Sequence, residues 1–232
     1  MIPEGWSATE LGKLAHFSSG GTPSKQRPEF WGGDYPWISG KDLKTHYLKN
    51  SIDKLSSSGF FVAKKAPKGA TLILVRGMTL LKDFPVGYAT KEMAYNQDVK
   101  ALLPANKVNP LFLSYLLLAN KNKIRQLVSI AGHGTGRIDT NTLKEFPVNL
   151  PPTTEQTKIA TILFTYDKAI ETVEKLINNS RTQKKSLMQQ LLTGKKRLPG
   201  FSRKWNEHIL GDLGKTYNGL TGKTKDDFGN GK

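Results

Sequence analysis

A single hydrophobic repeat constrains the fold of this chain more than any other feature. Positions spaced alternately four and three residues apart are mostly apolar over more than four heptads, which is typical of a coiled coil. These positions are Ile159, Leu163, Tyr166, Ile170, Val173, Ile177, Ser180, Lys184, Leu187 and Leu191. The sequence therefore predicts one long helix over residues 155–193, ended at Thr193 and Gly194.

Such a helix is too long for the rest of the chain to cover. At ~1.5 Å per residue it extends about 58 Å, whereas a small domain is only ~30 Å across. The alternative, a helix lying along its own domain, leaves at least half of the length bare. We therefore expect the apolar positions, called the seam below, to meet a partner helix in a homodimer; they are Ile159, Leu163, Tyr166, Ile170, Val173, Ile177, Leu187 and Leu191.

Upstream of the helix, the sequence predicts a mixed α/β domain. Short apolar runs bounded by Gly, Pro and Asp indicate strands, and Asn109-Pro110 supplies an N-cap and a first-turn proline for a helix over residues 111–127. The predicted strands cover residues 35–39, 71–75, 86–89 and 99–103. The tetrapeptide Thr153–Gln156 has the form of a capping box and predicts the start of the long helix.

The first residues of the chain recur near its other end. Each pair is separated by 199 positions: Trp6, Leu11, Gly12, Leu14, Gly20 and Thr22 return as Trp205, Leu210, Gly211, Leu213, Gly219 and Thr221. This identity in one register indicates an internal repeat. The expected architecture is an α/β (α+β) domain over residues 1–150, a long coiled-coil-forming helix over 151–198 and the start of a second copy of the domain over 199–232.

The charge of the chain indicates a polyanionic partner. Thirty-five Lys and Arg residues against 19 Asp and Glu residues leave a net charge of +16, spread over both halves of the chain. There is no cysteine, and no apolar run approaches the ~20 residues that a membrane span needs. We therefore expect a cytoplasmic protein that binds nucleic acid and has no membrane contact.

The sequence contains no complete catalytic signature. The four histidines occur singly, without the helical spacing of a metal site, so we expect neither a metal site nor catalytic residues. One alternative remains open: Asp98 and Lys100 have the Asp-x-Lys spacing of half a metal-dependent nuclease site. Another is a structural dimerisation module that does not bind DNA.

A series of short motifs follows a fixed order along the chain. The motifs are Pro3-x-Gly-Trp6, Tyr35-Pro-Trp-Ile38, Pro67-Lys-Gly69, Val75-Arg-Gly77, Asn96-Gln97, Leu150-Pro-Pro152, Glu155-Gln156, Ile159-Ala160 and Leu191-Leu-Thr-Gly-Lys195. Each motif is weak by itself, but together with the repeat they cover essentially the whole chain. In this order the sequence resembles the specificity subunit of Type I restriction-modification enzymes.

The resemblance implies a non-catalytic subunit that recognises double-stranded DNA. In this family a target-recognition domain reads one half of a split site, and the conserved helices act as spacer and docking surface. The partners it implies are methyltransferase (modification) subunits and restriction/translocase subunits. It also implies that S-adenosylmethionine, ATP and Mg²⁺ bind to those partners, so that this chain carries no cofactor.

Polar residues in glycine-rich loops are the candidates for direct DNA contact, because side chains there reach a ligand without disrupting a core. Lys25 and Lys41 are expected to contact phosphates. Arg76, Gln97 and Arg137 are expected to read bases, since Arg pairs with guanine and Gln with adenine in the major groove. Internal roles compete with this interpretation: a salt bridge for Arg76 and pairing with buried backbone groups for the Gln97 loop.

Overall fold

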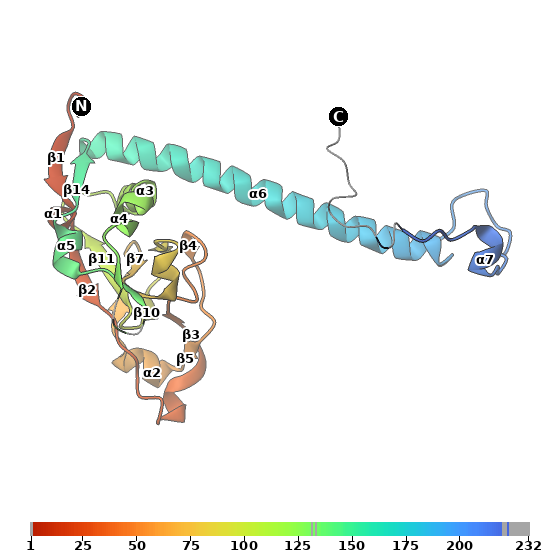
Figure 1. Cartoon of the computed structure of the whole chain (residues 1–232), viewed down its shortest axis with the longest axis horizontal. Coiled ribbons are helices and arrows are strands. Elements are labelled where there is room, and N and C mark those ends of the chain that lie inside the picture. Colours follow the sequence, from red (N-terminus) through yellow and green to blue (C-terminus); the bar gives the residue numbers. More distant parts are fainter. Residues whose placement is uncertain (1, 131, 133, 220–221, 223–232) are drawn as a thin grey trace. The chain divides into compact units, whose positions relative to one another are not determined.

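The computed structural model describes residues 2–130, 132, 134–219 and 222, and the chain divides into two compact units, Met1–Ala169 and Ile170–Lys232. The first unit is a mixed α/β domain together with the first part of a long helix (Figure 1). This division does not test the predicted limits of the domain at residue 150 and of the helical segment at residue 198, which stay predictions. No helix of the described residues is long and apolar enough to cross a membrane.

A five-stranded sheet forms the centre of the first unit, and it confirms three of the predicted strands. Its order is β2-β11-β7-β9-β4, with the first four strands antiparallel and β4 parallel to β9. The strands are β2 (Ala15–Ser19), β11 (Val99–Pro104), β7 (Thr71–Leu74), β9 (Val86–Ala89) and β4 (Tyr47–Leu48). All four residues of β7 are buried, so this strand runs through the main core.

A second, four-stranded sheet carries a smaller core of its own. Its order is β5-β3-β10-β6, and Trp37, Leu55, Ala63 and Ala94 are buried beside it. The strands are β5 (Lys54–Leu55), β3 (Trp31–Ile38), β10 (Met93–Tyr95) and β6 (Lys65–Ala66), with the short helices η1 (Pro28–Phe30) and α2 (Ser57–Val62) packed beside β3. The strand predicted at residues 35–39 is thus the second half of β3.

Two small sheets complete the unit. One sheet has the order β12-β13-β8, and the short helix η2 directly follows β8 in the sequence. The other sheet pairs β1 with β14, and the helices α1 and α5 lie near it. Their bounds are β12 (Ser129–Ile130), β13 (Gly136–Arg137), β8 (Arg76–Gly77), η2 (Met78–Leu81), β1 (Ser7–Glu10), β14 (Pro147–Leu150), α1 (Leu11–Leu14) and α5 (Thr140–Lys144). The pairing of β1 with β14 joins the two ends of the domain.

The helix predicted over residues 111–127 is two helices, so that prediction is wrong in its extent. Asn109 caps α3 (Pro110–Ala119) as expected, accepting hydrogen bonds from the next two free backbone N–H groups. The chain leaves helical geometry at Asn120, whose side chain donates to the Leu116 carbonyl at 2.8 Å. A second short helix, α4 (Lys121–Arg125), follows. A local side-chain hydrogen bond thus competes with helix continuation.

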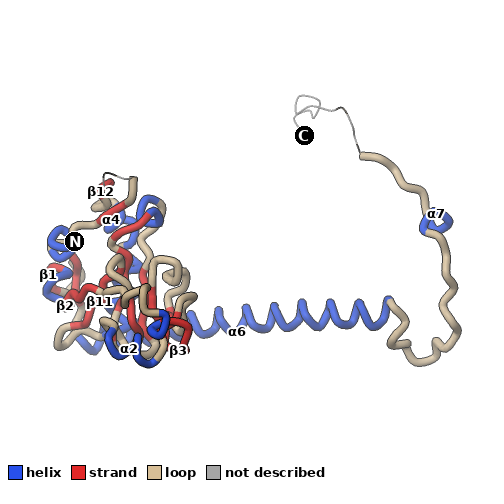
Figure 2. The backbone as a smooth tube through the Cα atoms, turned by 90° about the horizontal axis from the view of Figure 1, so that it is seen from below, coloured by secondary structure: helices blue, strands red, loops and turns tan. Residues whose placement is uncertain are grey.

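The long helix is confirmed as α6 (Thr153–Leu192), 40 residues in one continuous element (Figure 2). Its predicted capping box does not form. Thr153 Oγ1 donates instead to the Lys107 carbonyl at 3.1 Å, and the buried Gln156 side chain pairs with backbone groups around Asn109. The Thr-x-x-Gln pattern therefore ties the helix to a distant loop rather than capping its own first turn.

The internal repeat is also visible in the local structure. Helix α7 (Leu210–Leu213) of the second unit occupies the same four repeat positions as α1 in the first. Leu11 and Leu14 are buried in the main core, whereas Leu210 and Leu213 are exposed. Thr221, the last position of the repeat, lies outside the described residues. The two copies share a local conformation but not the same burial.

Candidate nucleic-acid interface

Backbone hydrogen bonds bring several loops of the first unit together. Gly21 N donates to the Tyr95 carbonyl at 2.9 Å, and Asn96 N donates to the Ile38 carbonyl at 2.9 Å. The Val75 N–H donates to the Asp98 carbonyl at 2.8 Å, and Ile138 N in turn donates to the Val75 carbonyl at 3.0 Å. The segments after β2, β3, β7, β10 and β13 are therefore neighbours. All five sequence-predicted DNA contacts lie in or next to these segments.

Glycines permit this close approach of loops. A Cβ on Gly20 would lie 2.2 Å from the Asn96 carbonyl oxygen and 2.4 Å from that of Tyr95. A Cβ on Gly40 would lie 3.0 Å from a methyl group of Leu74. The first of these positions excludes any other residue unless the backbone moves, so the glycine-rich character of the loops has a packing cause.

Arg76 and Arg137 stand directly opposite each other in the β8–β13 ladder. Both side chains are exposed. Among the described residues no ion pair joins either arginine to an Asp or Glu, although the charge of Arg137 acts on the nearby Asp139. Like charges directly opposite across two strands destabilise a sheet, and an anion between them removes the repulsion. The internal salt bridge considered for Arg76 is not observed among the described residues, and the pair presents two guanidinium groups to solvent.

Gln97 lies beside this arginine pair, because its neighbour Asp98 is bonded to Val75. Its side chain is exposed, and its Oε1 accepts a hydrogen bond from Thr22 Oγ1 at 2.6 Å. The adjacent Asn96 is buried, and its Oδ1 accepts from the Asp98 N–H at 3.1 Å. Satisfying the loop backbone is thus the role of Asn96, while the Gln97 amide is oriented by Thr22 with its NH₂ group available for a ligand.

Lys25 and Lys41 form a separate group around Asp53. Lys41 Nζ lies 4.0 Å from Asp53 Oδ2, and Lys25 and Asp53 line an open groove of about 480 Å³ with Trp31. The Trp31 ring packs edge-on against Trp37, with ring centroids 5.1 Å apart. Aromatic faces beside basic groups are typical of sites that bind single-stranded nucleic acid. Sequence reasoning missed Trp31 and Asp53, although Trp31-Gly32-Gly33 was a visible aromatic next to glycines.

The residues of the nuclease alternative have structural partners. The Lys100 ammonium donates to Ser19 Oγ at 2.8 Å, and the Asp98 carboxylate accepts from Asn96 Nδ2 at 3.3 Å. Burial, and secondly the charge of Lys144, lowers the pKa of Lys100. In the described ranges, three or more His, Asp or Glu side chains nowhere come close enough together to hold a metal ion. The geometry therefore does not favour the nuclease interpretation.

The seam of α6 is exposed. Tyr166 is 67% exposed and Ile170 is 56% exposed, and the remaining seam residues are exposed or half-buried. The side of α6 that contacts the rest of the first unit is marked instead by Gln156 and Ala160, both buried. At 100° per residue these two sides are roughly a quarter-turn apart. Packing on the domain thus leaves the predicted interface uncovered.

Comparison with known proteins gives a consistent result. The family model for the Type I restriction modification DNA specificity domain matches residues 3–179. The MjaIX specificity subunit of Methanocaldococcus jannaschii, a type I restriction enzyme subunit, is 33% identical over 181 residues, which are 75% of this chain and 40% of that protein.

Two solved structures share the fold. The S subunit of the type I restriction-modification system of M. genitalium aligns with a TM-score of 0.58 at 19% identity, over 82% of this chain and 46% of that one. The HsdS subunit of Thermoanaerobacter tengcongensis aligns with a TM-score of 0.55 at 17% identity, over 76% and 40%. The chain spans less than half the length of each of these relatives.

Proposed function

Because the chain belongs to the family of type I restriction-modification specificity subunits, we propose that it recognises DNA and catalyses no reaction itself. Its first unit reads one half of a bipartite site in double-stranded DNA. The observation that carries this proposal is the exposed Arg76 and Arg137 pair, two opposed cations for which no ion pair with a described Asp or Glu is found. Gln97 beside them adds a side chain able to pair with adenine.

The remaining predicted contacts fit a role in holding the DNA backbone. Lys25 lines the groove that contains Trp31, and Lys41 lies 4.0 Å from Asp53, another residue that lines it. Both lysine side chains are exposed. Phosphate contacts position a protein on DNA, and base contacts specify the sequence. On this proposal Lys25 and Lys41 supply affinity for any duplex, whereas Arg76, Gln97 and Arg137 supply selectivity.

The long helix supplies the second half of the proposed function. Two copies pair through the exposed seam of α6, and the paired helices dock modification subunits, with restriction/translocase subunits joining the assembly. S-adenosylmethionine, ATP and Mg²⁺ are bound by those partners in this scheme. The support for pairing is the run of exposed apolar side chains over successive turns of one helix, for which a second copy of the same seam is the simplest cover.

Salt-dependent DNA binding tests the recognition role. If about five phosphates are neutralised, the logarithm of the association constant falls against that of salt concentration with a slope of roughly −4 to −5. In fluorescence anisotropy, Arg76→Ala/Arg137→Ala should weaken binding and make the slope shallower by up to about 2 if both contact phosphates, or relax selectivity if they read bases.

A matched control removes the same charge elsewhere. Lys158 and Arg203 are exposed and lie outside the candidate interface. The variant Lys158→Ala/Arg203→Ala should leave DNA selectivity unchanged and weaken affinity less. Equal losses in the two double variants would mean that general charge, rather than the arginine pair, binds DNA. Affinity independent of salt would overturn the DNA-binding proposal.

A further inference from the structure

Helix α6 is attached to the rest of the first unit near its beginning. Gln156 is 1% exposed; its Oε1 accepts from Asn109 N at 2.8 Å, and its Nε2 donates to the Pro151 carbonyl at 2.9 Å. Trp6 Nε1 donates to Glu155 Oε1 at 3.2 Å, and Ala160 is buried one turn further along. These contacts fix where the helix starts, but contacts confined to two turns leave its direction weakly determined.

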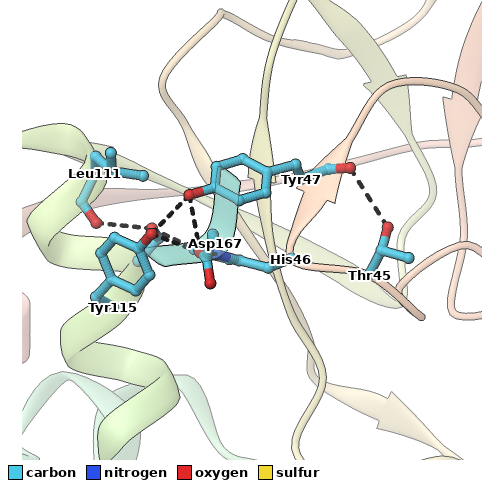
Figure 3. A network of polar contacts seen from close by, with 7 residues as sticks. Thr45, His46, Tyr47, Leu111, Tyr115 and Asp167 are labelled. Carbon is cyan, nitrogen blue, oxygen red and sulfur yellow. Dashed lines mark hydrogen bonds and ion pairs between the residues drawn. The ribbon is translucent and has the colours of Figure 1, made fainter. Parts of the chain in front are cut away.

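A second attachment lies three turns further along the helix, at Asp167. Its Oδ2 accepts a hydrogen bond from Tyr115 at 2.6 Å and another from Tyr47 at 3.0 Å, and the two tyrosine hydroxyls are 2.6 Å apart (Figure 3). Tyr47 comes from β4 and Tyr115 from α3, so one carboxylate joins three elements. Phe164, one turn earlier on α6, packs edge-on against Tyr47 with ring centroids 5.9 Å apart.

His46 completes this cluster. Its ring lies 4.7 Å from Tyr47 and 4.8 Å from Tyr115, centroid to centroid. Ser114 Oγ donates to the Leu111 carbonyl at 2.8 Å and lies 3.0 Å from His46 Nε2. On the other side of the ring, His46 Nδ1 faces Asp167 Oδ2 at 3.8 Å. The imidazole therefore packs between Ser114 and the Asp167 carboxylate.

The hydroxyl groups of Tyr47 and Tyr115 stay protonated near neutral pH and can therefore donate hydrogen bonds. Burial chiefly raises the pKa of Tyr47 to about 12, and burial together with the bond to Asp167 raises the pKa of Tyr115 far above its ordinary value. Charge-assisted hydrogen bonds of this kind are shorter and about twice as strong as neutral ones. Because polar clusters of this type demand one geometry, they specify an arrangement more narrowly than apolar contacts of the same area.

We infer that Asp167 is a positioning residue: by holding Tyr47 and Tyr115 it fixes the direction in which α6 leaves the recognition domain, and thereby the half-site spacing that the protein accepts. Gln156 and Asp167 are 11 residues apart, or roughly 16 Å along the helix axis. Two attachments at that separation define a line, whereas one defines only a pivot. The statement about spacing rests on the proposed function; the statement about direction does not.

Distance measurements between spin labels test the direction without DNA. The chain has no cysteine, so Lys91→Cys and Asn179→Cys provide two unique labelling sites, both exposed, on the domain and on α6. We expect a narrow distance distribution in the labelled parent chain and a broader one in Asp167→Ala and in Tyr115→Phe. Glu174→Gln, which removes an exposed carboxylate two turns further along the same helix, should not broaden it.

Methylation of DNA by the complex with modification subunits tests the spacing. Sites whose half-sites are moved by one base pair should be discriminated strongly by the parent chain. Loss of a charge-assisted hydrogen bond should reduce that discrimination roughly tenfold in Asp167→Ala. Glu174→Gln should discriminate like the parent. Circular dichroism at the assay temperature must show that Asp167→Ala is folded, and the milder Tyr115→Phe decides the question if it is not.

The outcomes separate this inference from the proposed function. Unchanged label distances in folded Asp167→Ala and in Tyr115→Phe would overturn the positioning role, whatever the chain binds. Broadened distances with unchanged spacing discrimination would overturn the link to spacing. If the parent chain neither binds DNA nor supports methylation, the proposed function fails together with that link, while the label distances still decide whether Asp167 holds the helix.

Discussion

His46 makes the stability of the first unit depend on pH near neutrality. Burial lowers its pKa from 6.5, against a smaller opposing effect of Asp167, so the folded state resists the proton that the unfolded chain takes up. The contribution of His46 to the free energy of unfolding is therefore fully present above pH 6.5. It is lost as the pH drops from 6.5 towards the pKa of His46 in the folded state. Denaturant unfolding at pH 7.5 and at pH 5.5 measures this loss. The unfolding free energy should decrease less between the two pH values in His46→Gln than in the parent chain. Equal decreases in the two proteins would mean that other groups cause the pH dependence.

Gly20 is a second residue whose environment sets a measurable cost. A methyl group there meets two carbonyl oxygens, whereas the nearest atom to a Cβ on the adjacent Gly21 is 3.8 Å away on a flexible lysine. Overpacking of this kind typically costs about 1–3 kcal/mol. We expect Gly20→Ala to lower the unfolding free energy by that amount and Gly21→Ala to lower it much less. Similar decreases in unfolding free energy for the two variants in denaturant titrations would mean that the entropy of the loop, and not steric contact at Gly20, causes both.

At the scale of elements, the seam of α6 makes a prediction about assembly. Ile170→Glu/Ile177→Glu places charges where two helices are proposed to meet, and an unpaired charge is costly to bury. In sedimentation velocity we expect the parent to be a dimer and this variant a monomer. Asn179→Glu/Gln189→Glu adds the same charge on another side of the helix and should stay dimeric. A dimer in the first variant would place the interface elsewhere.

Sequence reasoning identified elements whose cause is local and missed contacts whose cause is distant. The seam period predicts α6, and Asn109-Pro110 predicts the start of α3, because both signals lie within one helix. Thr153 and Gln156 were misread because their partners lie more than 40 residues away. Asp167 carried no signal at all, since its tyrosine partners are 52 and 120 residues distant.

For the candidate interface, the sequence indicates which residue types could bind DNA but not which of these residues are neighbours. Residue types in glycine-rich loops indicate candidates such as Arg76 and Arg137, but only strand register places these two opposite each other. Register depends on which strands pair, and β8 pairs with a strand about 60 residues further along. Composition therefore indicates candidate residues, and pairing across the fold decides which of them are neighbours. Their contact with DNA stays a prediction.

At the scale of the whole molecule, pairing of two α6 helices in antiparallel orientation predicts the symmetry of the DNA target. A two-fold axis then relates two identical recognition domains, so the target must be an interrupted palindrome. A helix of about 60 Å limits the half-site centres to roughly 17 base pairs apart at ~3.4 Å per pair. Mapping of methylated bases with modification subunits present checks this; an asymmetric bipartite site would mean that the functional unit contains two different domains.

The pairing of β1 with β14 has a consequence for how such a protein can be rebuilt. The polypeptide enters and leaves the recognition domain on adjacent antiparallel strands, with Ser7 opposite Leu150, and Trp6 reaches the first turn of α6 at Glu155. A domain whose two ends lie side by side can be removed and replaced as one unit, because only β1 and β14 connect it to the rest of the chain. On the proposed function, grafting a different domain between these strands exchanges the DNA half-site that is bound while α6 is left intact.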